Sequence, residues 1–216
     1  MKPLVFIADY IYALWLLFRS RLSTAQPSTN QGNNGLVILL PGVYENWYYF
    51  RRLKHSLVTH GFAVLHADDI YKGISIAEDS KALSNFIKDH SLENVSLIGH
   101  SSGGLTAVSC LQTAPAIKRV VAIATPFSGV ANGHIVRTSK VRELMPGSDT
   151  ITSVEVLSPN LANKVISIYP SYDNQIWSKS GSILKGAKNI RLNAKGHHLI
   201  LRSDGLAKTV VEALAS

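Results

Sequence analysis

The segment LIGHSSGG, residues 97–104, places two adjacent serines between glycines. Ser101 is the central residue of a G-x-S-x-G pattern that runs from Gly99 to Gly103. At a sharp strand-to-helix turn, the central serine is held in a strained backbone conformation that exposes its hydroxyl above the sheet. We therefore predict a serine nucleophile at Ser101, with the backbone N–H of Ser102 donating to a developing oxyanion. The alternative, a phosphate-binding loop, would have a lysine and a longer glycine spacing.

The base that activates such a serine must be sought among the eight histidines. His197 lies in KGHHLIL, between the last predicted strand and the last predicted helix, so we predict that it is the base. Its neighbour His198 is the alternative. His100 directly precedes the nucleophile, but the turn is expected to point its side chain away from the pocket. The other histidines are expected on solvated helices, at a strand end or in an irregular segment: His55, His60, His90, His66 and His134.

The base needs a carboxylate that fixes its tautomer and stabilises the imidazolium. Asp173, in YPSYDNQIW, follows the predicted strand at 164–170, so we predict that it is this acid. Asp149 precedes the same strand and would need a long reach, and Asp204 is expected to cap the last helix. A surface aspartate without a catalytic role is the alternative interpretation of Asp173.

A second oxyanion donor is expected in the loop after the first core strand, within LLPGVYENWYYF. Gly42 leaves room there for a substrate carbonyl, and the backbone N–H of Val43 is the predicted donor, with Tyr44 as the alternative. Tyr44 and Phe127 are the candidate residues of the substrate pocket.

Apolar runs that alternate with helical patterns must position these residues. The predicted strands span 35–41, 62–67, 94–100, 119–125, 164–170 and 187–193. The predicted helices span 47–59, 76–89, 102–113 and 204–215. Continuous apolar runs are typical of strands buried on both faces. The alternation predicts an α/β fold with a mostly parallel sheet and helices on both faces, and with its chemistry at the carboxyl ends of the strands.

The composition limits the classes of function. The 216 residues are 46% apolar, enough for one domain with a sizeable core. The net charge of +8 favours anionic surfaces such as phospholipid, or only solubility. The basic residues are scattered and no zinc-ligand spacing occurs, so nucleic acid is not expected as a partner. The single cysteine, Cys110, excludes an internal disulfide, and we expect a buried, inert thiol there.

The first 22 residues differ from the rest of the chain. They are apolar from residue 3 to residue 18 except at Asp9, and Arg19 and Arg21 follow. We predict a hydrophobic membrane anchor or signal segment at 1–22, a flexible linker at 23–34 and a catalytic domain at 35–216. The expected localisation is at a membrane through a single-pass anchor, or outside the membrane after cleavage of a signal peptide. An amphipathic helix packed on the domain is the third interpretation.

Several motifs together resemble the α/β-hydrolase superfamily and, within it, small bacterial lipase- or esterase-like proteins. They are VILLPGVYENW, VSLIGHSSGG, AIATPFSG, VRELMPGSD, YPSYDNQIW and GHHLIL. The resemblance implies the same catalytic set of Ser101, Asp173 and His197, with the oxyanion hole at the N–H groups of Val43 and Ser102. Many relatives have His-Gly where this chain has Pro41-Gly42, and His where it has Phe127. The region 128–163 is short for a large lid, so a minimal cap is expected.

These observations predict a serine hydrolase that cleaves carboxylic esters, of lipid type, through an acyl-enzyme and without a metal or organic cofactor. The expected partners are a lipophilic ester and membrane lipid, with no obligate protein partner. A thioesterase or amidase of the same fold is one alternative. A membrane-anchored binding protein that retains the fold without turnover is the other.

Overall fold

A computed structural model describes residues 3–23, 32–130, 138–178 and 180–215 of the chain. In this part of the chain a six-stranded sheet has the order β2-β1-β3-β4-β5-β6, and every adjacent pair is parallel. The strands are β1 (Leu36–Leu40), β2 (Ala63–His66), β3 (Val95–His100), β4 (Ile117–Ile123), β5 (Val165–Tyr172) and β6 (Lys188–Lys195). The predicted strands and the predicted parallel α/β fold are therefore confirmed.

The α-helices surround this sheet. They are α1 (Pro3–Leu22), α2 (Arg51–Thr59), α3 (Ile76–Asp89), α4 (Ser102–Leu111), α5 (Ser139–Arg142), α6 (Asp149–Glu155), α7 (Pro159–Ala162) and α8 (Asp204–Ala215). A 3₁₀ turn, Trp47–Phe50, leads into α2. The side chain of Ser75 accepts a hydrogen bond from the Glu78 N–H at 3.0 Å, so α3 begins with an N-terminal cap. All four predicted helices are present.

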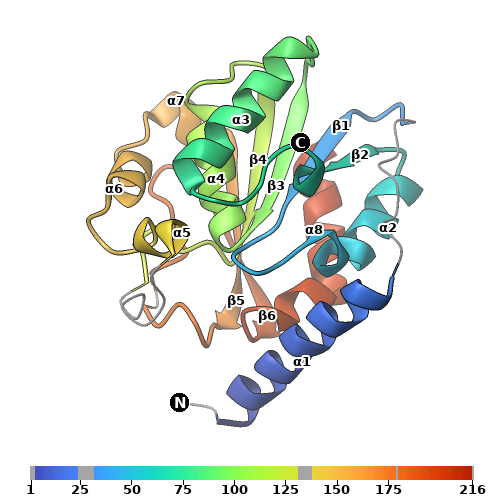
Figure 1. Ribbon diagram of the computed structural model, residues 1–216, viewed down its shortest axis with the longest axis vertical. Helices are drawn as coiled ribbons and strands as arrows, with labels where there is room; N and C mark the ends of the chain where they lie inside the picture. The colour runs from blue at the N-terminus through green and yellow to red at the C-terminus, as the bar shows by residue number, and fades with distance from the viewer. Residues whose placement is uncertain (1–2, 24–31, 131–137, 179, 216) are drawn as a thin grey trace.

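The sheet has an apolar layer on each face because alternate residues of each buried strand point in opposite directions. Ile38 and Leu40 pack with α3, α4 and α6 on one face, and Val37 and Leu39 pack with α2 and α8 on the other. Figure 1 shows these two helical layers on either side of the strands. Both faces of the central strands are buried, which explains their continuous apolar sequences.

The strand order reverses at β1, and this reversal locates the site. β1 pairs with β2 on one side and with β3 on the other. The loops after β1 and β3 therefore leave neighbouring strands at the same edge of the sheet, where an open α/β sheet forms its crevice. The loops after β5 and β6 reach the same carboxyl edge because all strands are parallel.

The first helix packs against the domain. Leu16 of α1 is fully buried, in the apolar layer that also holds residues of α2 and α8. Figure 1 shows α1 along the outside of this layer. By length and composition α1 could also cross a membrane, and a helix of this kind near the N-terminus is found both in anchors and in signal peptides. Most of the predicted linker, 24–31, lies outside the described residues.

The segment between β4 and β5 holds only short helices, α5, α6 and α7, with 131–137 outside the described residues. The predicted pocket residue Phe127 precedes this segment, but its side chain is only 1% exposed and belongs to the apolar core with α4 and α6. Its prediction as a pocket residue is wrong because the chain turns inward there to close the core. His134 lies outside the described residues.

Candidate active site

Ser101 lies at the turn between β3 and α4 in a strained conformation. Its φ of 53° and ψ of −124° place a residue with a side chain in a region that usually costs about 1–3 kcal/mol. Its N–H donates to the carbonyl of Ile123 in β4 at 2.9 Å, which fixes the turn to the sheet. Because the turn carries Ser101 away from the sheet at the start of α4, it has the geometry of a nucleophile elbow.

Two glycines allow this turn to pack closely. A side chain at Gly99 would overlap the backbone of Gly103, and a side chain at Gly103 would overlap the Leu40 carbonyl at the end of β1. Glycine at both positions therefore lets β1, β3 and the first turn of α4 approach one another around Ser101.

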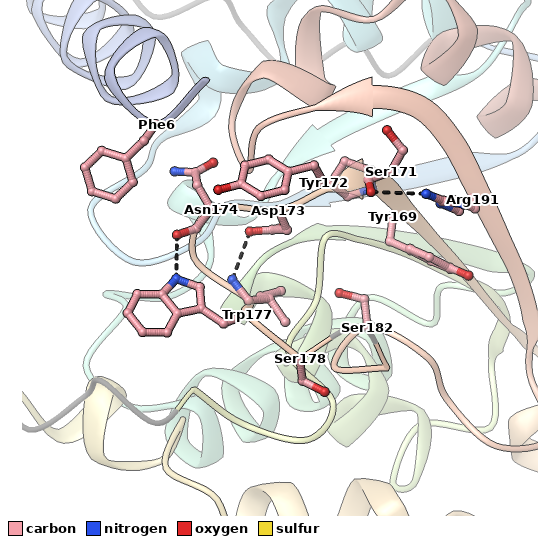
Figure 2. Close-up of a pocket in the computed structure, with 12 residues that line it drawn as sticks. Phe6, Tyr169, Ser171, Tyr172, Asp173, Asn174, Trp177, Ser178, Ser182 and Arg191 are labelled. Atoms are coloured by element: carbon pink, nitrogen blue, oxygen red, sulfur yellow. Dashed lines mark hydrogen bonds between the residues drawn. The ribbon is translucent and has the colours of Figure 1, made fainter. Parts of the chain in front are cut away.

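His197 and Asp173 form a buried pair at the same edge. The Nδ1–H of His197 donates to Oδ2 of Asp173 at 2.9 Å. The other carboxylate oxygen, Oδ1, accepts from the backbone N–H groups of Gln175 at 2.8 Å and Ile176 at 2.9 Å. Figure 2 shows Asp173 turned inward in the loop after β5. The acid is thus held in place by its own loop and orients the imidazole.

The two side chains shift each other's pKa in opposite directions. Burial raises the pKa of Asp173, but the charge and the hydrogen bond of His197, with the two backbone N–H groups, hold it below its usual value. Burial lowers the pKa of His197, but the Asp173 carboxylate, together with the nearby carboxylates of Glu45 and Asp9, outweighs burial and raises it. The pairing favours an imidazolium, the state a general base reaches when it takes a proton.

His100 connects the nucleophile elbow to the histidine loop, the segment after β6 that carries His197 and His198. Its side chain is fully buried, its Nδ1–H contacts Oε1 of Glu45 at 2.7 Å, and its Nε2 lies 3.0 Å from the carbonyl of His197. The rings of His100 and His197 have centroids 4.9 Å apart. As expected, the His100 side chain packs in the interior beside the turn and not in either cavity at the site, but its contact with the His197 backbone was not expected. The two ring nitrogens of His100 are thus within hydrogen-bond distance of Glu45 and of the His197 backbone, so the side chain links the two segments.

Glu45 holds the loop after β1, and sequence reasoning missed it. Its Oε2 accepts from the backbone N–H of Gly42 at 2.7 Å. Burial raises the pKa of Glu45, but His100, together with His198 and the Gly42 N–H, outweighs this effect and lowers it. A side chain at Gly42 would come within 3.0 Å of Cβ of Ser101, so this loop passes directly over the nucleophile. The sequence signal that could have revealed Glu45 is an acidic residue three positions after Gly42, in the oxyanion loop, the segment after β1 where the second oxyanion donor is predicted.

The predicted oxyanion donors belong to the residue after Ser101 and to the loop that passes over it. In the described part of the chain, the backbone N–H groups of Val43 and Ser102 have no hydrogen-bond acceptor, whereas the N–H of Gly42 donates to Glu45. Ser102 begins α4, whose first N–H groups point out of the helix end. Tyr44, with a φ of 61° and an exposed side chain, follows Val43 on the outer side of the loop.

Asp9 of α1 also enters this site and was missed. Its carboxylate is fully buried and accepts from His198 and from Asn174, the residue after the acid. The signal in the sequence is a single acidic residue in an otherwise apolar stretch.

Two cavities adjoin the site. One of about 750 Å³ lies on the acid side and includes Phe6, Tyr169, Tyr172, Asp173 and Trp177 in its lining. Figure 2 shows Phe6 reaching from α1 toward the loop that carries Asn174 and Trp177. The other cavity, of about 520 Å³, lies on the side of the oxyanion loop, and Val43, Tyr44, Tyr71 and Lys140 are part of its lining. Tyr44, a predicted pocket residue, therefore lines a cavity at the site, and its contact with substrate stays a prediction.

Other reactive side chains lie away from the site. Burial raises the pKa of the Cys110 thiol to about 11, so it is an inert core residue as predicted. Burial also lowers the pKa of His66 to about 4. Among the described residues, no group of three or more His, Cys, Asp or Glu side chains has the arrangement of a metal site.

The chain was compared with known proteins. No family model matches it, and no curated protein matches it. The enol-lactonase of Burkholderia xenovorans LB400 matches in structure with a TM-score of 0.59 and 16% identity, over 86% of this chain and 93% of that chain. The monoacylglycerol lipase of Paleococcus ferrophilus matches with a TM-score of 0.63 and 18% identity, over 87% and 96%.

Lipase B of Aspergillus fumigatus matches with a TM-score of 0.67 and 18% identity, over 84% of this chain and 52% of that chain. This chain therefore corresponds to about half of the fungal lipase. Together with the parallel sheet and the elbow, these similarities show that the chain has the α/β-hydrolase fold.

Proposed function

We propose that this protein is a serine hydrolase that cleaves carboxylic esters. The observation that carries the proposal is the strained elbow at Ser101, joined through His100 to a buried His197–Asp173 pair. These are the three residue types and the order that a Ser-His-Asp mechanism requires on this fold. The structural neighbours named as lipases and an enol-lactonase support ester chemistry.

The reaction would take two steps. In the first step, Oγ of Ser101 attacks the ester carbonyl while His197 takes the hydroxyl proton, and Asp173 stabilises the imidazolium. The negative charge that develops on the carbonyl oxygen is held by the backbone N–H groups of Val43 and Ser102. The C–O bond then breaks, and the leaving alcohol receives the proton from His197. In the second step, water activated by His197 attacks the acyl-enzyme and releases the acid and Ser101.

A lipophilic substrate fits the surroundings of this site. Phe6, Tyr172 and Trp177 contribute apolar surface to the cavity on the acid side. The outer face of α1 is apolar and exposed, and the net charge of +8 favours anionic lipid. We propose that the protein associates with membrane lipid through this helix and acts on lipid-type esters there.

Thioesters and amides share the same acyl chemistry, so a thioesterase or amidase is the nearest alternative. A protein of this fold that binds a ligand without turnover is the second. The buried pairing of His197 with Asp173 argues against it, because a buried ion pair contributes little net stability and a binding protein has no use for it.

The test is covalent labelling by a fluorophosphonate, followed by hydrolysis of p-nitrophenyl esters of increasing chain length. We expect labelling and ester hydrolysis with the wild-type chain and neither with Ser101→Ala. Ser109→Ala, which removes a hydroxyl from the same helix away from the turn, should retain both. Absent labelling of the folded wild type, or labelling that persists in Ser101→Ala, would overturn the proposal. The chain-length series reports the acyl preference, and thioester and amide analogues decide between the enzymatic alternatives.

A further inference from the structure

One face of α1 is bound to the domain along its length. Leu16 is buried in the core, and Tyr49 donates a hydrogen bond from its hydroxyl to the carbonyl of Ala13 at 3.0 Å. Nearer the end of the helix, Nδ2 of Asn46 donates to Oγ of Ser20 at 2.9 Å. Because Ala13, Leu16 and Ser20 follow helical spacing, they form a continuous contact face, and Asp9 occupies the position one turn earlier on it.

The Asp9 carboxylate is saturated by donors from the catalytic loops. Its Oδ1 accepts from the backbone N–H groups of His198 and Leu199, each at 2.8 Å. Its Oδ2 accepts from Nδ1 of His198 at 2.9 Å and from Nδ2 of Asn174 at 3.1 Å. A buried carboxylate is tolerated only when it is well hydrogen-bonded, and these four bonds supply that requirement.

These bonds determine where the backbone of His197 lies. The N–H of His197 donates to Oδ1 of Asn174 at 2.9 Å, so Asn174 links Asp9 to the base itself. On the other side of the base, Gly196 has a φ of +107°, and a side chain there would come within 2.6 Å of Oδ1 of Asp9. The histidine loop therefore closes around the Asp9 carboxylate. Asp9 bonds directly to the backbone that follows His197, and it is linked to the base itself through Asn174.

We infer that Asp9 is a positioning residue for the catalytic histidine, and that α1 is part of the catalytic unit. An apolar residue at this position would pack the helix equally well, but would leave the N–H groups of His198 and Leu199 buried without partners. The Asp9 side chain both attaches α1 to the domain and holds the histidine loop in place. Removal of α1 would therefore disturb His197. This inference depends on the proposed function for its catalytic readout.

The charges around His197 give the inference a second measurable consequence, which is the pH dependence of catalysis. Asp173, Glu45 and Asp9 are the carboxylates that raise its pKa against the lowering effect of burial, and Asp173 has the largest effect of the three. The rings of His100 and His198 also face it, at centroid distances of 4.9 and 5.1 Å. If Asp9 loses its charge, the pKa of His197 falls. A general base acts when neutral, so the acidic limb of kcat/KM then moves to lower pH.

The experiment measures p-nitrophenyl ester hydrolysis from pH 5 to pH 9 by the full-length chain and its Asp9→Asn variant. We expect kcat to fall by about 10- to 100-fold, because a displacement of catalytic groups by about 1 Å can cost 100-fold. KM should change by less than about threefold, and the midpoint of the acidic limb should shift to lower pH. Ser20→Ala, which removes one contact about three turns further along the same helix, should retain kcat, KM and the midpoint.

Each outcome decides the inference. A folded Asp9→Asn variant with wild-type kcat and pH profile overturns it. If this variant does not fold by circular dichroism, Asn174→Ala removes the link from Asp9 to His197 and leaves the bonds of Asp9 to His198 and Leu199 in place, and unchanged kcat in that folded variant overturns the inference. If the wild type neither hydrolyses esters nor reacts with fluorophosphonate, the proposed function fails. The downfield proton resonance of the His197 Nδ1–H then remains as a readout, and identical resonances in wild type and Asp9→Asn overturn the positioning role.

Discussion

At the scale of residues, the histidines next to the predicted nucleophile and the predicted base each make a supporting contact. His100 precedes Ser101 and pairs with Glu45, and His198 follows His197 and pairs with Asp9. His198 also lies 3.6 Å from Glu45, so the two pairs meet behind the site. The two loops that carry the nucleophile and the base are therefore fixed to each other by buried polar contacts, which favours one arrangement of the site.

The acid can be tested by a nearly isosteric change. In Asp173→Asn, the amide cannot hold the imidazole in the required tautomer or stabilise its cation, so kcat should fall by about 10⁴-fold. The measurement is p-nitrophenyl ester hydrolysis, with the unfolding midpoint measured in parallel.

The matched control is Asp149→Asn, at the first residue of α6 and outside the site. It should hydrolyse esters at the wild-type rate. Near-normal turnover by Asp173→Asn would exclude Asp173 as the acid. In that variant the pKa of His197 also loses its largest raising influence, so any residual activity should persist to lower pH than in the wild type.

Sequence reasoning selected Ser101, Asp173 and His197 because each follows a predicted strand of a parallel sheet. Their loops must then meet at one edge, and the structure joins Asp173 to His197. Glu45 and Asp9 could not be derived in this way. Their roles depend on a buried contact with a histidine in another segment, and neither the burial nor the contact is visible in the local pattern.

At the scale of elements, the sequence predicted the strands and helices well because their apolar runs are continuous. The start of β4 differs from the prediction, because the strand begins at Ile117 and not at residue 119. Lys118 in this strand is exposed, so the apolar run begins late although Ile117 already pairs with Val95. The packing of α1 on the domain was only the third interpretation of its sequence, because the inner face carries the polar residues Asp9 and Ser20 and so does not stand out as an apolar stripe.

The close approach of α4 to β1 leads to a prediction on stability. Gly103→Ala would place a methyl group against the Leu40 carbonyl, and neither backbone segment can move freely. We expect the free energy of unfolding to fall by at least about 1–3 kcal/mol, the usual cost of overpacking. Urea denaturation followed by circular dichroism measures this change.

A second glycine provides the control. A methyl group at Gly205, in the first turn of α8, would have only Oγ of Ser203 within 4 Å, at 3.7 Å. Gly205→Ala should therefore be neutral or stabilise the protein by up to about 1 kcal/mol. Equal stabilities of the two variants would show that the elbow does not depend on Gly103.

At the scale of the whole molecule, α1 presents two different faces. Its inner face is bound to the site through Asp9, and its outer face exposes large apolar side chains. These are Leu4, Ile7, Ile11, Leu14, Phe18 and Leu22. A spanning orientation would remove Asp9 from its donors and place a carboxylate inside the bilayer, at about 2.5–3.5 kcal/mol or more. With α1 docked in this way, the proposed contact with lipid would take place at the membrane surface and not through the single-pass anchor predicted from the sequence.

This attachment can be measured by sedimentation with vesicles that contain an anionic phospholipid. The wild-type protein should bind them, and binding should weaken with salt because the net charge of +8 contributes. Leu14→Glu places a charge on the exposed face of α1 and should lower binding at least about tenfold, since burying one large apolar side chain contributes about 1.5–3 kcal/mol.

Val156→Glu is the control because Val156 is also exposed but follows α6, on the opposite side of the sheet from α1. It should bind vesicles as the wild type does. Leu14→Glu should also keep wild-type hydrolysis of a short soluble ester, since Leu14 lies outside the contact face that carries Asp9 and Leu16. Equal vesicle binding by wild type and Leu14→Glu would mean that this face does not contact lipid. Loss of soluble-ester hydrolysis in Leu14→Glu would mean that the two faces of α1 do not act separately.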